Sequence, residues 1–426
     1  MAFLQTIPEF HDPATGVKLI GVADQRFKRA LVEVLFELPL DASRAARSLL
    51  LDVLEQGSAQ FPSRTALARE LQNLYGASCE VYSERSCEAH RVGLQVSCLG
   101  QQFLPPGEGV LLPALDLISG VLFEPLRGDS GELFNMSYIK RERSNLLDML
   151  AERKDNRSAY AAERFRSVMC AEEEYGKLSW ESSAAVAELS CEQLEAARLE
   201  IINDAAVTIV CSGAIDVQAV AEWAQRQFAS KTRAVDIVAP SESFPAELRH
   251  VNEHLAMEQA KLHIGLRLNL PQEIVDREAL IMACSILGGG SHGRLFQIIR
   301  EQKSLAYGIY SRLHGRKHIL SVDAGIDAGA AKEVEDEVFK QIELLANEGP
   351  SEIEMQLAQA NRLNGLAALA DSPAAMSNFY HSAYILGLET TPHDRAQACL
   401  QLSVEQVQQA ASNWQPDLVY LLSAAE

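Results

Sequence analysis

The order of strand-like and helix-like segments repeats within this chain, and this repeat restricts the possible folds more than any other feature. Short apolar or alternating runs predict strands at residues 17–22 and 30–38, and again at 249–257 and 261–268. In both halves these strands are followed by helices, two further strands and more helices. Such an internal repeat is the pattern expected of two copies of one structural unit.

The two halves also match in register. The shift that places Ser63 on Ser291 also places Leu67 on Leu295. The same shift places His90 on His318. We therefore predict an α+β protein with two homologous domains in tandem, each a largely antiparallel sheet with helices packed on one face.

The boundary between the copies is predicted from composition. Residues 229–247 are rich in Ser, Ala and Pro and have weak periodicity, which is typical of an interdomain linker. We therefore predict a first domain at residues 1–228 and a second at residues 248–426.

Charge and composition exclude several functional classes. A net charge of -20 and a pI near 5.0 argue against a nucleic-acid surface, which needs clustered Lys and Arg. The eight cysteines include no C-x-x-C pair and are expected to be reduced thiols. No stretch approaches the ~18 apolar residues of a membrane span, and the N-terminus has no secretory pattern. We expect a cytoplasmic protein that does not bind nucleic acid or membranes, and no motif predicts a cofactor.

The stretch LGGGSHGRLFQIIREQKSLAYGIYS, residues 287–311, is the strongest candidate site. It opens with three consecutive glycines, Gly288, Gly289 and Gly290. Ser291 is placed to cap a helix whose last turn carries Arg300, and Tyr307 lies on the strand that follows. A glycine loop, a helix and an Arg/Tyr pair are suited to holding a peptide. The alternative is a surface arginine and a half-buried tyrosine with no ligand.

One string has the spacing of a zinc motif. Residues 250–254 read HVNEH, which fits H-x-x-E-H. That spacing forms a zinc site on a helix, whereas the surrounding residues predict a strand. On a strand His250 and His254 share one face and Glu253 points the other way. A zinc site at this pair is therefore kept only as an alternative to two surface histidines.

The sequence ILGGGSHGRLFQIIREQKSLAYGIYS resembles the second-domain motif of the pitrilysin or insulinase metallopeptidases, in their short-chain branch with the mitochondrial processing peptidases. The doubled domain and the linker extend the resemblance over essentially the whole chain. It is greatest to a bacterial non-catalytic branch, which includes a companion protein linked to elongation factor P modification. In this family an arginine and a tyrosine seven residues apart contact substrate, and they match Arg300 and Tyr307.

Active members of the family carry H-x-x-E-H on the first long helix of the first domain. Aligning the Gly-Thr that follows their motif with Gly57-Ser58 places the motif positions at Ser48, Leu51 and Asp52. Residues 41–74 contain no histidine, so a shift of register does not restore the motif. The resemblance therefore implies no catalytic residue and no metal ligand in this chain.

The function implied is that of a catalytically silent subunit that grips an extended peptide for a zinc-bearing sibling in a heterodimer. A homodimer is the possible state in isolation. Two alternatives remain open at this stage. The first is an independent metallopeptidase that uses His250 and His254. The second is a peptide-binding scaffold in a protein-modification pathway.

Overall fold

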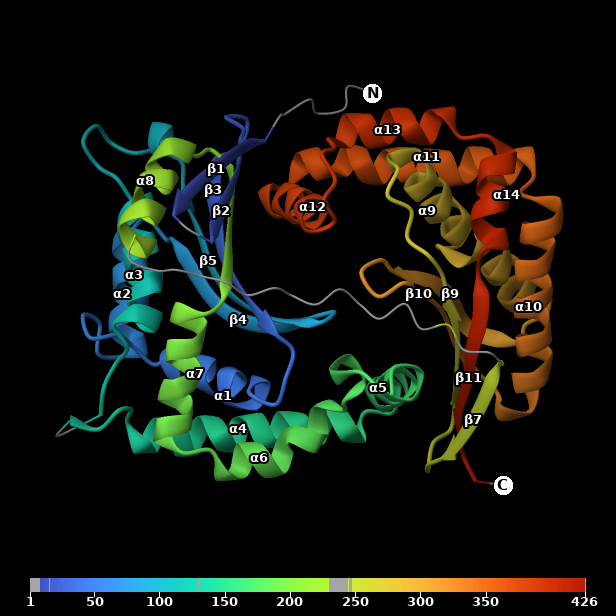
Figure 1. The fold of residues 1–426 in the computed structure, drawn as a ribbon, viewed down its shortest axis with the longest axis horizontal. Coiled ribbons are helices and arrows are strands. Elements are labelled where there is room, and N and C mark those ends of the chain that lie inside the picture. Colours follow the sequence, from blue (N-terminus) through green and yellow to red (C-terminus); the bar gives the residue numbers. More distant parts are fainter. Residues whose placement is uncertain (1–7, 15, 129–130, 230–243, 245–246, 426) are drawn as a thin grey trace.

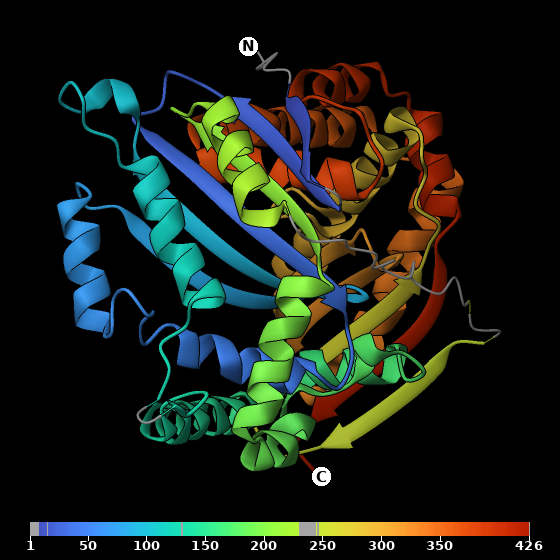
Figure 2. The ribbon, with the colours of Figure 1, turned by 60° about the vertical axis from the view of Figure 1, so that its left-hand side comes forward.

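The computed structural model describes residues 8–14, 16–128, 131–229, 244 and 247–425, and contains two β-sheets with surrounding helices (Figure 1). Residues up to 228 form the first sheet and its helices, and those from 249 onwards form the second. When the molecule is turned by 60°, the first half comes forward and the second lies behind it (Figure 2). In the described part of the chain, no helix is both long and apolar enough to cross a bilayer.

The first sheet has six strands in the order β1-β2-β6-β3-β5-β4. They are β1 (Glu9–Ala14), β2 (Val17–Ala23), β3 (Arg29–Pro39), β4 (Ser78–Ser86), β5 (Ala89–Leu99) and β6 (Ala206–Gly213). The β2–β6 pair is parallel and all other pairs are antiparallel.

The second sheet has five strands in the order β7-β11-β8-β10-β9. They are β7 (Arg249–His254), β8 (Ala260–Arg267), β9 (Ala306–His314), β10 (Ile319–Ile326) and β11 (Gln415–Ser423). Again one pair, β7–β11, is parallel and the others are antiparallel. The order β2-β6-β3-β5-β4 of the first sheet is thus repeated, with β1 as an additional edge strand. The α+β fold with two similar units is confirmed.

In both halves the first strands are followed by helices, as predicted. In the first half they are α1 (Arg44–Leu54), α2 (Arg64–Asn73), α3 (Leu111–Phe123), α4 (Met136–Asp155), α5 (Arg157–Met169), α6 (Ser183–Glu188), α7 (Cys191–Asn203) and α8 (Val217–Phe228). In the second half they are α9 (Ile274–Gly288), the π-helix η5 (Phe296–Gln302), α10 (Ala331–Glu348), α11 (Glu352–Ala368), α12 (Pro373–Ile385), α13 (Pro392–Gln401) and α14 (Val404–Ser412). The described residues also include the short 3₁₀ segments η1 (Gln101–Phe103), η3 (Glu174–Gly176), η4 (Ser179–Ser182), η6 (Ala328–Ala330) and η7 (Leu369–Asp371).

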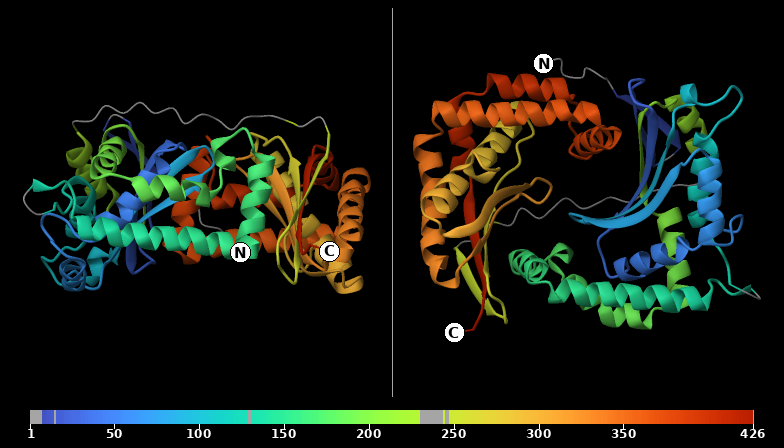
Figure 3. Two further views of the ribbon diagram at one scale, coloured as in Figure 1. Left: turned by 90° about the horizontal axis from the view of Figure 1, so that it is seen from below. Right: turned by 180° about the vertical axis from the view of Figure 1, so that it is seen from behind.

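Each sheet carries most helices of its own half on one face and receives a helix of the other half on the opposite face. Helix α5 packs on β8 and β11, where Phe165 and Met169 join Leu418 and Tyr420 in one apolar cluster. Helix α12 packs on β2, β3 and β6 through a second cluster that includes Met376. The right-hand view of Figure 3 shows α5 and α12 beside these sheets, with the molecule seen from behind. This exchange refines the prediction of helices on a single face, because the sequence does not tell which sheet a helix covers.

Polar contacts also join the halves. Lys317, in the turn between β9 and β10, is buried and pairs with Glu88 and Glu173 of the first half. Arg267 on β8 donates a 2.6 Å hydrogen bond to the carbonyl of Met169 and a 2.9 Å bond to Asp417. The two halves are therefore held together by charge as well as by apolar packing.

The predicted linker at residues 229–247 lies almost entirely outside the described residues. The division into domains 1–228 and 248–426 stays a prediction.

Candidate functional site

The positions that correspond to the zinc motif lie on α1. Leu49 and Leu50 face the core, whereas Ser48, Leu51 and Asp52 line a cavity of about 590 Å³. We call it the first-half cavity; α1, β4, β5, α4 and the segment after α5 form its walls. Burial raises the pKa of the Asp52 carboxyl to about 6, and the carboxylates of Glu55 and Glu142 add to this.

This cavity does not fit zinc. Ser48 and Leu51 offer no nitrogen or thiolate ligand, and zinc sites in proteins use Cys, His and carboxylates in sets of three or four. Arg44 and Arg85 also line the cavity and would repel a divalent cation. Within the described ranges, no group of three His, Cys, Asp or Glu side chains is placed to hold a metal.

His250 and His254 lie on strand β7, as the sequence predicts, and not on a helix. Both are on its exposed face, while Glu253 points inward and pairs with Arg164. Four residues of strand span about 13 Å, too far for two imidazoles to share one ion. His250 is instead 3.0 Å from Glu335. The geometry rules out the alternative zinc site at this pair.

We expect the purified chain to bind less than a stoichiometric amount of zinc. Metal analysis after dialysis against zinc should give a content well below one ion per chain, because neither position supplies a ligand set. The variant His250→Ala should give the same value. One zinc per chain that is lost in this variant would contradict the geometry.

The glycines of the second-half motif lie where α9 ends against β9. A Cβ on Gly288 would lie 2.8 Å from the backbone nitrogen of Ser311, and Gly288 is buried. The N–H of Gly289 donates to the carbonyl of Ser285, and Gly290 has a φ of 147° that favours glycine. The glycines therefore permit close packing of the helix end on the strand, and a contact of theirs with substrate stays a prediction.

The helix after the glycines differs from the prediction. Ser291 lies in a turn and does not cap it, since the N–H of Gln297 donates to Gly293. From Phe296 to Gln302 the segment is a π-helix, in which the N–H of Lys303 reaches back to Ile298. Apolar spacing does not distinguish this from an α-helix, and π-helical turns are frequent at functional sites.

Arg300 and Tyr307 both reach solvent. The Arg300 guanidinium lies 4.6 Å from the ring centroid of Phe296, and its side chain is 43% exposed. Tyr307 is 62% exposed, and its hydroxyl donates a 3.0 Å hydrogen bond to Asp327. The pair is accessible to a ligand, and its role in holding substrate stays a prediction.

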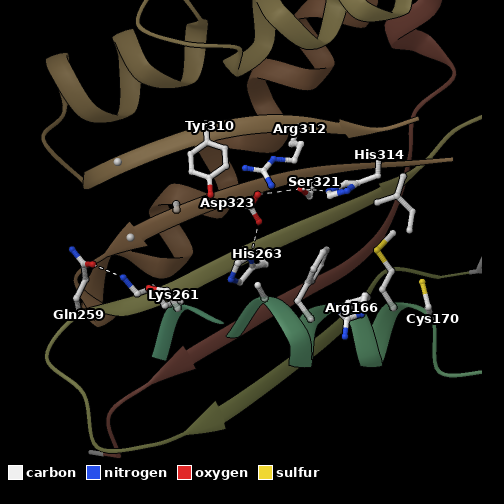
Figure 4. A pocket seen from close by; sticks show the side chains of 18 of the residues that line it. Arg166, Cys170, Gln259, Lys261, His263, Tyr310, Arg312, His314, Ser321 and Asp323 are labelled. Atoms are coloured by element: carbon white, nitrogen blue, oxygen red, sulfur yellow. Dashed lines mark hydrogen bonds and ion pairs between the residues drawn. The ribbon is translucent and has the colours of Figure 1, made fainter. Parts of the chain in front are cut away.

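A second cavity, of about 500 Å³, lies between α5 and the face of β8, β9 and β10 (Figure 4). We call it the interface cavity. The strands alternate, so that Tyr310, Ser321, Asp323 and His263 face the cavity while residues between them enter the core. The exposed strand residue Tyr307 lies on its lining.

A polar network crosses the floor of this cavity. Asp323 lies 2.5 Å from His263 Nδ1 and accepts a 3.1 Å hydrogen bond from Ser321, whose oxygen is 3.1 Å from His314 Nε2. Burial alone would raise the Asp323 pKa, but hydrogen bonds from His263 and Ser321 lower it overall. Burial lowers the pKa of His314. The network thus keeps the Asp323 carboxylate ionised on the floor of the interface cavity.

The sequence analysis missed both the residues of this network and the arginines of the first-half cavity. A signal for the network exists in β8, where Lys261, His263 and Arg267 alternate with apolar residues in a strand of buried type. The arginines come from separate elements, and no spacing in the sequence brings them together.

Comparison with known proteins finds similarity to one peptidase family. A family model described as "Peptidase M16 inactive domain" matches residues 188–362. A "Probable inactive metalloprotease YmfF" of Bacillus subtilis is 24% identical over 410 residues, covering 95% of this chain and 95% of that protein. An "Uncharacterized zinc protease" of Mycobacterium tuberculosis is 25% identical over 64% of each chain.

Solved structures share the fold over the full length. A conserved protein from Enterococcus faecalis superimposes with a TM-score of 0.88 at 20% identity, covering 98% of this chain and 99% of that one. A peptidase M16 inactive domain from Pseudomonas fluorescens gives a TM-score of 0.78 at 18% identity, with 98% coverage of both chains. These matches confirm the resemblance to the pitrilysin and insulinase peptidases, which M16 denotes. Together with the replaced zinc positions, they show that the chain is similar to inactive members of the peptidase M16 family.

Proposed function

We propose that this chain is a non-catalytic, substrate-binding subunit that holds an extended peptide for a zinc-bearing sibling of the same family. The observation that carries the proposal is the position of strand β9, which is an edge strand of the second sheet in the described part of the chain. Its outer backbone groups are available for pairing with an added strand. Tyr307, Gly308 and Tyr310 of this strand also line the interface cavity.

The chemistry of these residues supports peptide holding. An extended peptide that pairs with β9 would place alternate side chains over the cavity. The Arg300 guanidinium can donate hydrogen bonds to a peptide carbonyl, and the Tyr307 hydroxyl can do so by exchanging its bond to Asp327. The proposal includes a cytoplasmic location, and a sibling rather than a second copy as the functional partner.

With the sibling present, Arg300→Ala is expected to lower kcat/KM for a fluorogenic peptide by roughly 10- to 100-fold. A hydrogen bond from a charged donor contributes about 1.5–3 kcal/mol, which corresponds to that range. Assembly, measured by size-exclusion chromatography, should be unchanged.

The matched control is Arg226→Ala, an exposed arginine in the last turn of α8. It removes the same charge far along the chain from β9 and should leave turnover as in the unmodified protein. Unchanged turnover in Arg300→Ala would contradict the proposal, as would full turnover by the sibling alone.

A further inference from the structure

The first-half cavity retains about 590 Å³ of space where the family's zinc motif would lie, and its lining is rich in arginine. Arg44 comes from α1, Arg85 from β4, Arg153 from α4 and Arg166 from α5. These four elements converge on one hollow, although the chain as a whole carries a net charge of -20. The cluster is therefore not a consequence of a basic composition.

Three of these arginines donate mainly to backbone carbonyls. Arg44 donates to Leu178 at 3.1 Å, and Arg85 donates to Tyr175 at 2.9 Å. Arg166 also donates to the Tyr175 carbonyl at 2.9 Å. A carbonyl satisfies a donor but does not neutralise its charge.

Glu163, Glu174 and Glu181 attract Arg44 at a distance, but no carboxylate among the described residues pairs directly with Arg44 or Arg85. Glu163 is shared between Arg153 and Arg166, and it also accepts two hydrogen bonds from Ser179. Glu84, which lines the cavity, is engaged by Arg91 at 2.6 Å. Burial raises the pKa of the Asp52 carboxyl to about 6, so this carboxyl on the lining is mostly ionised at neutral pH and offsets part of the positive charge.

A buried structural arginine in this chain has a different environment. Arg47 is fully buried, donates two hydrogen bonds to Glu200 at 2.8 and 3.0 Å, and contacts Asp41 at 3.1 Å. Its charge is matched by two carboxylates, as buried charges in proteins usually are. Among the described residues, no carboxylate pairs with Arg44 or Arg85 in this way.

The electrostatic consequence is visible in neighbouring groups. Burial lowers the pKa of Arg85 to about 9, and the charges of Arg166 and Arg44 contribute. Burial likewise lowers the pKa of His90 to about 3, with Arg47, Arg44 and Arg85 adding to the effect. The buried Nδ1 of His90 has no hydrogen-bond partner among the described residues.

We propose that the first-half cavity binds a carboxylate group of an acidic peptide segment, with Arg44, Arg85 and Arg166 as its ligands. Guanidinium groups bind carboxylates through paired N–H donors, and a bound carboxylate would offset the repulsion among them. The lining also includes apolar side chains such as Leu51 and Leu146, but the charge of the arginines favours an acidic group and would reject a basic one.

A peptide is favoured over a free small anion because the cavity adjoins a strand edge. Strand β4 is an edge strand of the first sheet in the described part of the chain. Its residues Tyr82 to Arg85 form part of the cavity wall. A peptide paired with β4 would direct alternate side chains into the cavity. Arg166 and Tyr175 line both this cavity and the interface cavity, so one extended chain would pass along both. The inference rests on the proposed peptide-holding function and adds the class of peptide.

The test compares two labelled peptides that differ only in charge. One carries Glu at alternate positions and the other carries Gln, and both have amidated C-termini; a third, Gln peptide has a free C-terminal carboxylate. Dissociation constants are measured by fluorescence anisotropy with the full chain. We expect the Glu peptide to bind roughly 10- to 100-fold more tightly than its Gln twin, the range for a charge-assisted hydrogen bond. Tighter binding of the third peptide alone would assign the site to a C-terminal carboxylate, which also supports the proposal.

Arginine variants test whether the preference for the Glu peptide arises at this cavity. Arg85→Gln should reduce it to less than about threefold, well below the effect expected of a charge-assisted hydrogen bond. Arg44→Gln serves as a second variant if Arg85→Gln does not fold by circular dichroism. Arg69→Gln, an exposed position on α2 outside the lining, is the matched control and should keep the preference.

The outcomes separate this inference from the proposed function. Equal affinity for all three peptides would overturn the carboxylate site and leave peptide holding intact. A preference that persists in both Arg85→Gln and Arg44→Gln would also overturn it. Binding of neither peptide would overturn both. Inorganic phosphate bound at this cavity, in the absence of any peptide preference, would overturn the peptide assignment.

Discussion

Replacing Lys317 with Met is expected to lower the free energy of unfolding by about 3–5 kcal/mol, the usual cost of removing one partner from a buried ion pair. The Lys317 side chain is 1% exposed and pairs with Glu88 and Glu173, and its ammonium lies 4.9 Å from the ring centroid of Tyr175. Burial would lower the Lys317 pKa, but hydrogen bonds to Glu173 and Glu88 raise it overall. The variant would leave the two carboxylates facing each other, with only Arg267, 4.0 Å from Glu173, as a remaining cation among the described residues. Urea unfolding followed by circular dichroism measures the loss.

Two further variants make this result specific. Lys340→Met removes a lysine whose side chain is 63% exposed, and should change stability by less than about 0.5 kcal/mol. Adding Glu88→Gln and Glu173→Gln to Lys317→Met should recover most of the loss, because no unpaired charge then remains buried. A loss below about 1 kcal/mol in Lys317→Met would show that the contact is as weak as a surface ion pair.

Acidification is expected to destabilise the protein through two buried histidines. Burial lowers the pKa of both His90 and His381 to about 3, and nearby arginines contribute in each case. Both values lie below the ~6.5 of an unfolded histidine, so the unfolded chain binds protons first as the pH falls. Stability is therefore complete above pH ~6.5 and falls between that value and pH ~3. At pH 5 the loss is about 2 kcal/mol per histidine.

Chemical denaturation at a series of pH values measures this dependence. His381→Gln should reduce the slope of stability against pH in this window by about half of the part due to the two histidines. His250→Gln, at an exposed position on β7, is the control that removes an imidazole without altering a buried site. A slope that is the same in His381→Gln and the unmodified chain would contradict the assignment.

The fold was largely predictable because its signal is local and repeated. The strand that carries Tyr307 is predicted from the sequence and is strand β9 of the structure. The exchange of α5 and α12 was not predictable. Both are amphipathic segments, and periodicity tells that a helix buries one face but not which sheet it buries it against.

The candidate site was predictable only in part. The absence of histidine from residues 41–74 excluded the zinc motif directly from the sequence. The π-helical turn before Arg300 was missed, because its apolar spacing is compatible with an α-helix. The cluster of Arg44, Arg85 and Arg166 depends on tertiary contacts between elements distant in the chain, and these leave no trace in local spacing.

The exchanged helices have a consequence for the order in which the chain matures during synthesis. The face of the first sheet formed by Ile20, Val22, Leu35 and Val210 is covered by Met376 and Tyr380 of α12. Those residues leave the ribosome long after the sheet they cover, and distant contacts of this kind form slowly. The apolar face of the N-terminal half therefore stays uncovered until α12 has been synthesised. During that interval the nascent chain depends on its own solubility or on a chaperone.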